Sequence, residues 1–561
     1  MEEFVKKIQV GEKFKVQFVS MTHDGKGVCK IRGILKDDTI AENFPIFVND
    51  AITQEEGIIE ITSLKKTLGN GKIIKIFKDK TSKFRKEAIC PIYEYCGGCH
   101  LMHMTYEGQL AFKKSMVKQT MEKIGGLKDI KVKNVIPSVE EEKYRNKVQI
   151  PFGYKNNKTV CGFYKNQSHD IIPLESCFIQ SDEMTEIVKF IRNLCNEFKI
   201  RGYNEEKHTG DLRHVLVRES KTTNQIMVVL VTLKKEIRNI DEFIKKLTTR
   251  HPKITSIMQN INDKQTNVIL GEETINLYGK DYIEDILLNN TFKIGTTSFY
   301  QVNPKTTEVL YQKAIELAEF KPTDNIIDAY CGIGTIGICA ANKVNHVYSV
   351  EIVKEAIKNA KENAKTNKIK NIEFAVGKSE EQIIKWKKAG LKIDAIIVDP
   401  PRNGLDTVLM DTISEMEIKK ILYISCDPAT LARDIKYLMN LGYTTNTVQP
   451  VDMFPHTNHV ETITLLQKKD IDDWLKVRFD LDNVPLVKEE TKAIYQEIKD
   501  YIFNKYNVKV STLNIAQTKT KYGIIERERY NKPKDYDSRQ PKCTRGKEEM
   551  ILDDLKHFKM L

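Results

Sequence analysis

The stretch that decides the fold is residues 325–341, which read NIIDAYCGIGTIGICAA. The first five, Asn325–Ala329, are mostly apolar and predict a buried strand. Gly332 and Gly334 break this pattern, and the apolar residues after them predict a helix. Glycines at such a turn let the backbone bend tightly and approach a ligand closely. Together the strand, turn and helix predict the ligand-binding turn of a parallel sheet.

Two cofactors fit this turn. Gly332, Gly334 and Gly337 have the spacing G-x-G-x-x-G, so a nicotinamide-dependent dehydrogenase is one candidate. The next predicted strand, HVYSVE, ends in Glu351, and an acid there can accept hydrogen bonds from both hydroxyls of a ribose. S-adenosylmethionine also carries a ribose. The turn by itself therefore leaves the two cofactors open.

The pattern of strand, turn and helix repeats from about residue 291 to residue 467, which predicts a doubly wound α/β sheet. The predicted strand Ala395–Val398 is followed by Asp399-Pro400-Pro401-Arg402. Two prolines fix a rigid turn, and this turn places Asp399 at the carboxyl end of the strand, where ligands bind in such sheets. An ordinary strand-end cap is the alternative interpretation of Asp399.

Cys426 follows another predicted strand, Lys420–Ser425, and the next residues, Asp427 and Pro428, are typical of a helix start. A thiol at a helix N-terminus is expected to have a lowered pKa and to react as a thiolate. The alternative is a buried small apolar residue, which we expect Cys339 to be.

Residues 450–466, PVDMFPHTNHVETITLL, place Glu461 at the start of a last predicted strand. A carboxylate in that position can act as a general base. A surface charge at a strand end is the alternative.

Cys90, Cys96 and Cys99 form C-x5-C-G-G-C, and Cys177 lies far downstream. The chain has 11 cysteines, an odd number, and it begins MEEFVKKIQV, without the apolar core of a secretion signal. We therefore expect metal-binding or catalytic thiols in place of a disulfide scaffold. Four thiolates can hold a 4Fe–4S cluster or a structural zinc ion, and the spacing alone leaves both open.

Residues 1–78 alternate polar and apolar side chains in short runs such as KFKVQFVSMT and GVCKIRG. Five short strands in this space favour a small β-barrel of the oligonucleotide-binding kind, with a β-rich cap as the alternative. Residues 79–290 are predicted to form a central α+β domain, with a helix at residues 109–126 that stops at a glycine pair and a strand at residues 225–233.

Residues 468–561 are predicted to form a further segment, with an amphipathic helix at residues 490–506, a strand at residues 508–517 and a loop at residues 531–546. The whole chain has 561 residues and 40% hydrophobic residues, which suit a globular protein of three or four domains. No apolar run is long enough to cross a membrane, and we expect a cytoplasmic location. The net charge of +12 suits a polyanionic partner, although solvated lysine faces would give the same charge.

Five blocks of sequence, in one order, resemble the TrmA/RumA family of RNA 5-methyluridine methyltransferases. They are SFYQVN at residues 298–303, DAYCGIG at 328–334, DPPR at 399–402, SCDPAT at 425–430 and HVE at 459–461. The resemblance covers residues 1 to about 467, including a barrel that looks like a TRAM domain. It implies a Rossmann-like S-adenosylmethionine-dependent methyltransferase domain at residues 291–467. The segment after residue 470 matches nothing in the family pattern, and it could add RNA contacts or simply pack.

The resemblance also implies a mechanism. The Cys426 thiolate adds to C6 of a uracil, which makes C5 nucleophilic enough to take the methyl group from S-adenosylmethionine. Glu461 then removes the C5 proton. Phe299 is placed to stack near a target base that has left its helical stack. The residues implied for the methyl-donor site are Gln301, Tyr330, Glu351 and Asp399.

The RumA branch carries C-x5-C-x2-C with a distant fourth cysteine, so the resemblance implies a 4Fe–4S cluster on Cys90, Cys96, Cys99 and Cys177. The branch that methylates tRNA lacks these cysteines, which favours 23S ribosomal RNA as the substrate. Cys161 is a spare cysteine near the fourth ligand. No obligate protein partner is evident, and a monomer is the default expectation.

Some positions depart from the family pattern or are ambiguous. Thr335 stands where some members have Asn after the second glycine of the turn, and Lys378 stands where an Asp or Asn often contacts the adenine. The contacts to the adenine are therefore less defined than the role of Glu351. Residues 144–147, Tyr-Arg-Asn-Lys, and the pair Arg213-His214 resemble RNA-facing segments of the family. They could equally form a solvated face or structural ion pairs.

Overall fold

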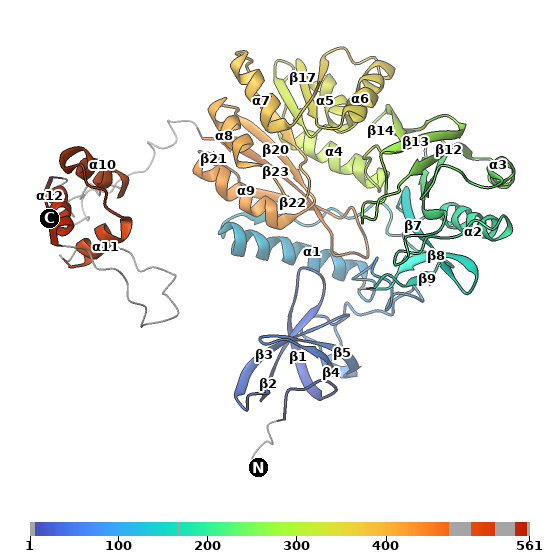
Figure 1. Ribbon diagram of the computed structural model, residues 1–561, viewed down its shortest axis with the longest axis horizontal. Coiled ribbons are helices and arrows are strands. Elements are labelled where there is room, and N and C mark those ends of the chain that lie inside the picture. Colours follow the sequence, from blue (N-terminus) through green and yellow to red (C-terminus); the bar gives the residue numbers. More distant parts are fainter. Residues whose placement is uncertain (1–5, 167, 470–494, 522–544, 558–561) are drawn as a thin grey trace. The chain divides into compact units, whose positions relative to one another are not determined.

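A computed structural model describes residues 6–166, 168–469, 495–521 and 545–557 (Figure 1). The chain divides into two compact units, Met1–Ile471 and Asp472–Leu561. The first unit holds a small barrel, a central sheet and a larger α/β sheet. No helix within the described ranges is long and apolar enough to cross a membrane.

The N-terminal strands close into a barrel in the order β1-β2-β3-β5-β4, which confirms the expected small β-barrel. Along β1 the buried side chains of Phe14, Val16 and Phe18 alternate with exposed polar ones, because successive residues of a strand point to opposite faces. The strands are β1 (Lys13–Met21), β2 (Gly27–Ile34), β3 (Ile40–Val48), β4 (Glu56–Leu64) and β5 (Gly69–Ile76).

Helix α1 (Tyr106–Thr120) follows the cysteine-rich segment. Thr105 caps its start by accepting a hydrogen bond from the Gly108 N–H. The helix continues as one π-helical turn, η2 (Met121–Gly125), and ends at Gly126, which has a φ of 70°. This confirms the predicted helix and its glycine stop, since the left-handed conformation suits glycine.

The central sheet has seven strands in the order β13-β12-β11-β10-β7-β8-β9, and α2 and α3 pack against one hydrophobic cluster of it. The strand predicted at residues 225–233 is β11, which is buried along its whole length. The elements are β7 (Lys147–Lys155), β8 (Lys158–Tyr164), β9 (Ile171–Pro173), α2 (Asp182–Glu197), β10 (Leu212–Glu219), β11 (Ile226–Thr232), α3 (Ile240–Arg250), β12 (Ile254–Ile261) and β13 (Glu273–Gly279). A separate ribbon, β14 (Tyr282–Leu287) and β15 (Asn290–Gly295), precedes the larger sheet.

The larger sheet has the order β18-β17-β16-β19-β20-β23-β22-β6, with β21 also paired to β23. Its first five strands are parallel, and β23 runs antiparallel to β20. The strands are β6 (Lys131–Val132), β16 (Asn325–Ala329), β17 (His346–Glu351), β18 (Ile372–Val376), β19 (Ala395–Val398), β20 (Lys420–Ser425), β21 (Tyr443–Thr444), β22 (Thr447–Val451) and β23 (Glu461–Lys468).

Both faces of this sheet are buried. Ile326 and Ile327 are neighbours on β16 and both are fully buried, yet they belong to two different hydrophobic clusters. Helices α4 (Pro304–Ala318), α5 (Thr335–Ala340) and α6 (Lys354–Thr366) contribute to the first cluster, and α7 (Ser379–Lys388), α8 (Thr407–Glu415) and α9 (Pro428–Asn440) to the second (Figure 1). The predicted doubly wound sheet is therefore confirmed.

The second unit contains α10 (Tyr495–Tyr506), α11 (Thr512–Lys521) and α12 (Arg545–His557) around a small apolar core. The helix predicted at residues 490–506 is confirmed for its described part, and the strand predicted at residues 508–517 is wrong. Ser511 Oγ accepts a hydrogen bond from the Asn514 N–H, and this local cap starts a helix where alternation suggested a strand. Of the loop predicted at residues 531–546, residues 531–544 lie outside the described part of the chain.

Candidate active site

The glycine turn joins β16 to α5 in a conformation that few residue types accept. Gly332 has a φ of 55° and Gly334 a φ of 84°, while Tyr330 adopts a φ of 66° although it is not a glycine. The Gly337 N–H donates to Asp328 Oδ2 at 2.9 Å, and a Cβ at this position would lie 2.6 Å from the same oxygen. Close packing of helix on strand thus accounts for the third glycine, without any need for a dinucleotide.

Three acids stand at the carboxyl ends of adjacent strands in this sheet. Glu351, at the end of β17, accepts the Gly332 N–H on Oε2 at 3.2 Å and the Val353 N–H on Oε1 at 3.0 Å. Asp328 lies on β16 and Asp399 directly follows β19. Burial raises the pKa of both aspartates. This edge of the sheet therefore favours a ligand that brings hydroxyl donors and positive charge.

Gln301 belongs to a segment, residues 298–303, that is hydrogen-bonded to residues of the central domain. Asn146 Nδ2 donates to the Gln301 carbonyl at 3.0 Å, and the Asn146 N–H donates to the Val302 carbonyl at 2.8 Å. Arg218, which is buried, donates to the Ser298 carbonyl at 2.8 Å. Phe299 between these anchors is 68% exposed, so its ring is free to meet a planar partner.

Cys426 lies between the end of β20 and the start of α9, as the sequence predicts. Asp427 caps α9, with Oδ1 accepting the Ala429 N–H at 2.8 Å. The lowered thiol pKa that we expected from the helix start is wrong. Burial, followed by the charges of Glu461 and Asp399, raises the pKa of Cys426 to about 11, and Arg402 opposes that rise. Desolvation and two nearby carboxylates outweigh the helix terminus.

Glu461 is the first residue of β23, and strand pairing brings it beside Cys426. Ser425 is opposite Thr462 in the antiparallel ladder, and Thr462 Oγ1 donates to the Ser425 carbonyl at 3.0 Å. Glu461 is 2% exposed, and its Oε2 has no hydrogen-bond partner among the described residues. Burial and the neighbouring Asp399 raise the pKa of Glu461, while Arg402 lowers it.

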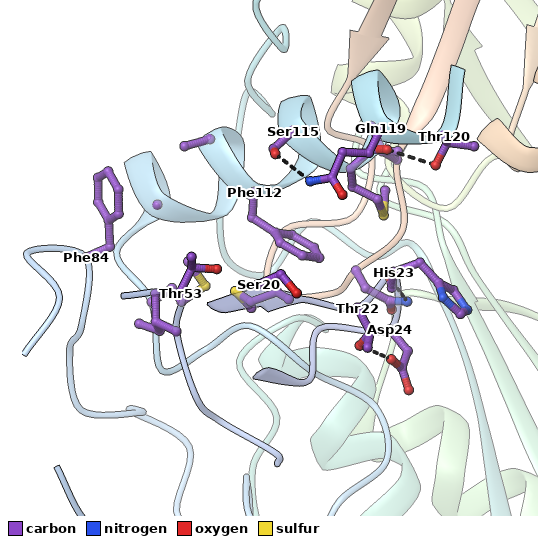
Figure 2. A pocket seen from close by; sticks show the side chains of 18 of the residues that line it. Ser20, Thr22, His23, Asp24, Thr53, Phe84, Phe112, Ser115, Gln119 and Thr120 are labelled. Carbon is purple, nitrogen blue, oxygen red and sulfur yellow. Dashed lines mark hydrogen bonds between the residues drawn. The ribbon is translucent and has the colours of Figure 1, made fainter. Parts of the chain in front are cut away.

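A groove of about 1280 Å³ opens above Cys426. One side of the groove is formed by Arg402, Cys426 and His459 of the α/β domain, and other walls come from α1 and the barrel. Figure 2 shows Phe112 of α1 among barrel side chains such as Ser20 and Thr22. Burial lowers the pKa of His459 to about 4, so its imidazole is neutral near pH 7.

Only some of the residues predicted from the sequence line the groove beside Cys426. Of the catalytic and cofactor candidates, Cys426 lines the groove, whereas Tyr330 lines a separate pocket of about 800 Å³ with residues of α8 and α9. The groove residues of α1 and the barrel were missed, because they lie hundreds of positions from Cys426. Arg402 belongs to the DPPR block, which predicts no role for it, and its charge acts on both Cys426 and Glu461.

The four predicted cluster cysteines line one enclosed cavity of about 40 Å³. The spare Cys161 does not line it: this residue is 1% exposed and packs in the core of the central domain. Within the described ranges, no group of three or more histidine, cysteine or acidic side chains is arranged to hold a metal ion. The four cysteines that line this cavity are Cys90, Cys96, Cys99 and Cys177.

The pair Arg213-His214 does not form an RNA-facing surface. Arg213 is 4% exposed and donates to the carbonyls of Asn262 and Lys264, both at 2.7 Å. Burial lowers the pKa of His214 to about 4. Arg213 instead holds a loop through backbone carbonyls, which is neither the solvated face nor the ion pair considered as alternatives.

The strands from β18 to β20 are parallel, and β23 is antiparallel beside β20. A glycine turn follows β16, and β17 ends in the acid Glu351. Together these features define an S-adenosylmethionine-dependent methyltransferase of Rossmann-like fold. Residues 105–469 match the family described as tRNA (Uracil-5-)-methyltransferase. The chain belongs to this family, and it is an S-adenosylmethionine-dependent RNA (uracil-5-)-methyltransferase. The dehydrogenase alternative is thereby set aside.

Similar proteins agree with this assignment. An uncharacterized RNA methyltransferase of Bacillus cereus is 45% identical over 461 residues, which are 82% of this chain and 98% of the relative. One from Clostridium tetani is 44% identical over 453 residues, 81% of this chain and 96% of the relative. The crystal structure of Pyrococcus abyssi tRNA (uracil-54, C5)-methyltransferase in complex with S-adenosyl-L-homocysteine has a TM-score of 0.61 and 27% identity, covering 81% of this chain and 100% of that one.

Proposed function

We propose that the protein methylates C5 of a uridine in 23S ribosomal RNA through a covalent bond between Cys426 and C6. The observation that carries this proposal is the pairing of β20 with β23, which sets a thiol and a buried carboxylate side by side at a large groove. The thiol serves as nucleophile and the carboxylate as base. Release of 5-methyluridine requires both groups, because the thiol activates the uracil carbon and the carboxylate removes its proton after methylation.

The proposed reaction has three steps. The Cys426 thiolate bonds to C6, and the electron pair of the C5–C6 double bond moves to give an enolate. C5 then bonds to the methyl carbon while the methyl–sulfur bond of S-adenosylmethionine breaks and releases S-adenosylhomocysteine. Finally Glu461 takes the C5 proton, the C5–C6 double bond forms again, and the C6–sulfur bond breaks to restore the thiolate.

The methyl donor would bind at the strand ends that carry the acids. We assign Glu351 to the ribose hydroxyls, because each of its oxygens accepts one backbone N–H and a carboxylate oxygen can accept a further hydrogen bond. The sulfonium of the donor is positive, which suits Asp399 when its carboxyl is ionised. Gln301 and the backbone of Tyr330 complete the set of residues that we assign to the donor.

Adduct formation should speed up as the pH rises, because the thiolate reacts and the pKa of Cys426 is raised to about 11. Below that pKa the thiolate fraction grows about tenfold per pH unit. Arg402→Gln removes a charge that lowers this pKa, so its profile should shift to higher pH. Rapid-quench measurement of the RNA adduct from about pH 7 to about pH 9.5 tests this. Arg402→Lys keeps the charge and is the control; a flat wild-type profile would contradict the expectation.

The choice of ribosomal RNA rests on the four cysteines, which line one cavity. The resemblance is to the RumA branch of the family, which carries such cysteines, whereas the branch that methylates tRNA lacks them. We propose that Cys90, Cys96, Cys99 and Cys177 hold a 4Fe–4S cluster, since an all-thiol donor set suits iron–sulfur and all four residues line the same cavity. A bound cluster would cross-link the segment before α1 to residue 177. The three reaction steps above move a methyl group and a proton and use no electron.

Protein purified without oxygen is expected to be brown and to contain about four irons per chain. Cys99→Ser should lose most of that iron, because it removes one of the four thiolates. Cys161→Ala is the matched control, since Cys161 lies outside the cavity. Colourless wild-type protein with one zinc ion would favour the zinc alternative over the cluster.

The function itself is tested with labelled methyl donor and separate transcripts of 23S ribosomal RNA and transfer RNA, followed by nucleoside analysis. We expect 5-methyluridine in the ribosomal transcript, and in cells its loss from one ribosomal site when the protein is absent. Product in transfer RNA alone would overturn the choice of substrate. Methylation of another base, or of an amine, would overturn the uracil chemistry.

A further inference from the structure

The loop that leads into Glu461, residues 452–460, is held by the buried face of α1. Lys113 Nζ lies 2.6 Å from Asp452 Oδ1 and 3.0 Å from the carbonyl oxygen of Phe454. The side chains of Lys113 and Asp452 are both fully buried, so neither water nor salt screens this ion pair. The start of the loop is therefore tied to a helix that is remote in sequence.

His456 is the second point of attachment. It has a φ of 67°, which a residue with a side chain rarely adopts. Its N–H donates to Gln109 Oε1 at 2.8 Å, and Gln109 Nε2 lies 3.2 Å from its ring Nδ1. Its carbonyl accepts the N–H groups of His100 and Leu101 at 2.8 and 2.9 Å. Such a conformation persists only where the surroundings enforce it, and Gln109 supplies two of the contacts.

A second, adjoining face of α1 borders the groove. Phe112, Ser115 and Gln119 line it together with the barrel (Figure 2). Asn458 and His459, which belong to the loop that α1 holds, line the same groove. One helix thus contacts both the space for RNA and the loop that precedes the base.

The carboxylate of Glu461 depends on this support. Its Oε2 has no hydrogen-bond partner among the described residues, so the backbone must fix where the carboxylate lies. That backbone is set by its pairing with Val451 and by the incoming loop. A misplacement of about 1 Å in a reacting group can cost about 100-fold in rate.

We propose that Gln109 and Lys113 are positioning residues for Glu461, so that the helix bordering the RNA groove also sets the geometry of proton removal. This inference rests on the proposed function, in which Glu461 takes the C5 proton. It assigns α1 a part in the last step of the reaction. The attack by Cys426 and the methyl transfer do not depend on Glu461 and should proceed without that support.

Gln109→Leu tests the proposal, because leucine is of similar size and removes both contacts to His456. A misplaced base should slow release alone, so the methylated protein–RNA adduct should accumulate by about tenfold or more over wild type. The full-length variant is mixed with RNA and labelled methyl donor, and adduct and free 5-methyluridine are measured on denaturing gels. Gln109→Glu keeps the oxygen that accepts the His456 N–H and should restore part of the release rate.

Lys118→Leu is the matched control on the same helix, since Lys118 is exposed and does not line the groove. Its ratio of adduct to product should equal that of wild type. If Gln109→Leu lowers adduct and product together, Gln109 has only a structural role and the proposal is wrong. The same conclusion follows if Lys118→Leu accumulates adduct equally.

The double variant Lys113→Met/Asp452→Asn provides a second test, because removing both charges avoids leaving one of them buried alone. It should also accumulate methylated adduct, and a normal ratio would overturn the role of Lys113. Wild-type protein that gives neither adduct nor 5-methyluridine refutes the proposed function, whereas normal wild-type turnover with normal variant ratios refutes only the role of α1.

Discussion

Cys426→Ser is expected to lower the rate of 5-methyluridine formation by about 10⁴-fold or more, as loss of a catalytic nucleophile does elsewhere. A serine hydroxyl ionises far less readily than a thiol, so it cannot supply the anion that adds to C6. The substitution is nearly isosteric, and no hydrogen bond from the Cys426 thiol would be lost. Radiolabelled methyl transfer to the ribosomal transcript measures the effect.

Two further measurements make this result specific. Binding of S-adenosylhomocysteine should be unchanged, because Cys426 lies on the groove side and the acids that we assign to the donor lie at other strands. Cys339→Ala is the control: Cys339 belongs to α5 and is buried, with its sulfur against Leu287 and Asn290 of the β14–β15 ribbon, so its loss should affect stability more than rate. A Cys426→Ser protein that still made 5-methyluridine at the wild-type rate would exclude the covalent mechanism.

The α/β sheet could be predicted because its signals are local. The glycines after β16 and the prolines after Asp399 mark strand ends within a few residues. The carboxyl ends of parallel strands lie at the same edge of the sheet. The placement of Cys426 and Glu461 follows from the same logic. Short-range patterns therefore located the residues that we assign to the chemistry, and the family resemblance assigned their roles.

Other features depend on contacts between distant segments. β6 adds a strand beside β22, 316 positions later in the chain, and its two residues carry no recognisable strand pattern. The pKa of Cys426 rises because Glu461 and Asp399 lie near a desolvated thiol, whereas the sequence displayed only the helix start. The groove forms only where α1 and the barrel lie next to the segment that carries Cys426. None of these effects is visible in a window of neighbouring residues.

Glu461→Gln is expected to trap the enzyme as a methylated covalent adduct and to slow product release by about 10² to 10⁴-fold, the usual contribution of a general base. The amide is isosteric but cannot take the C5 proton. Denaturing gels with labelled methyl donor should show label retained on protein-bound RNA. Glu373→Gln, at an exposed position of β18, is the control and should turn over normally.

If Glu461→Gln released product at the wild-type rate, Glu461 would not be the base. Asp399, whose pKa burial also raises, would then be the next candidate. Asp399→Asn distinguishes the two carboxylates: loss of donor binding fits the role that we assign to Asp399, whereas adduct accumulation with normal donor binding would identify it as the base.

The Glu461→Gln variant should be more stable than wild type at neutral pH. Burial raises the pKa of Glu461 in the folded chain above its value in the unfolded chain. A carboxyl shifted in this direction destabilises the fold increasingly as the pH rises from the unfolded pKa toward the folded one. Glutamine carries no such penalty, so the gain in melting temperature should be larger at about pH 8 than at about pH 5. A gain that did not depend on pH would be due to packing instead of charge. In that case ionisation of the buried Glu461 carboxyl would not destabilise the fold.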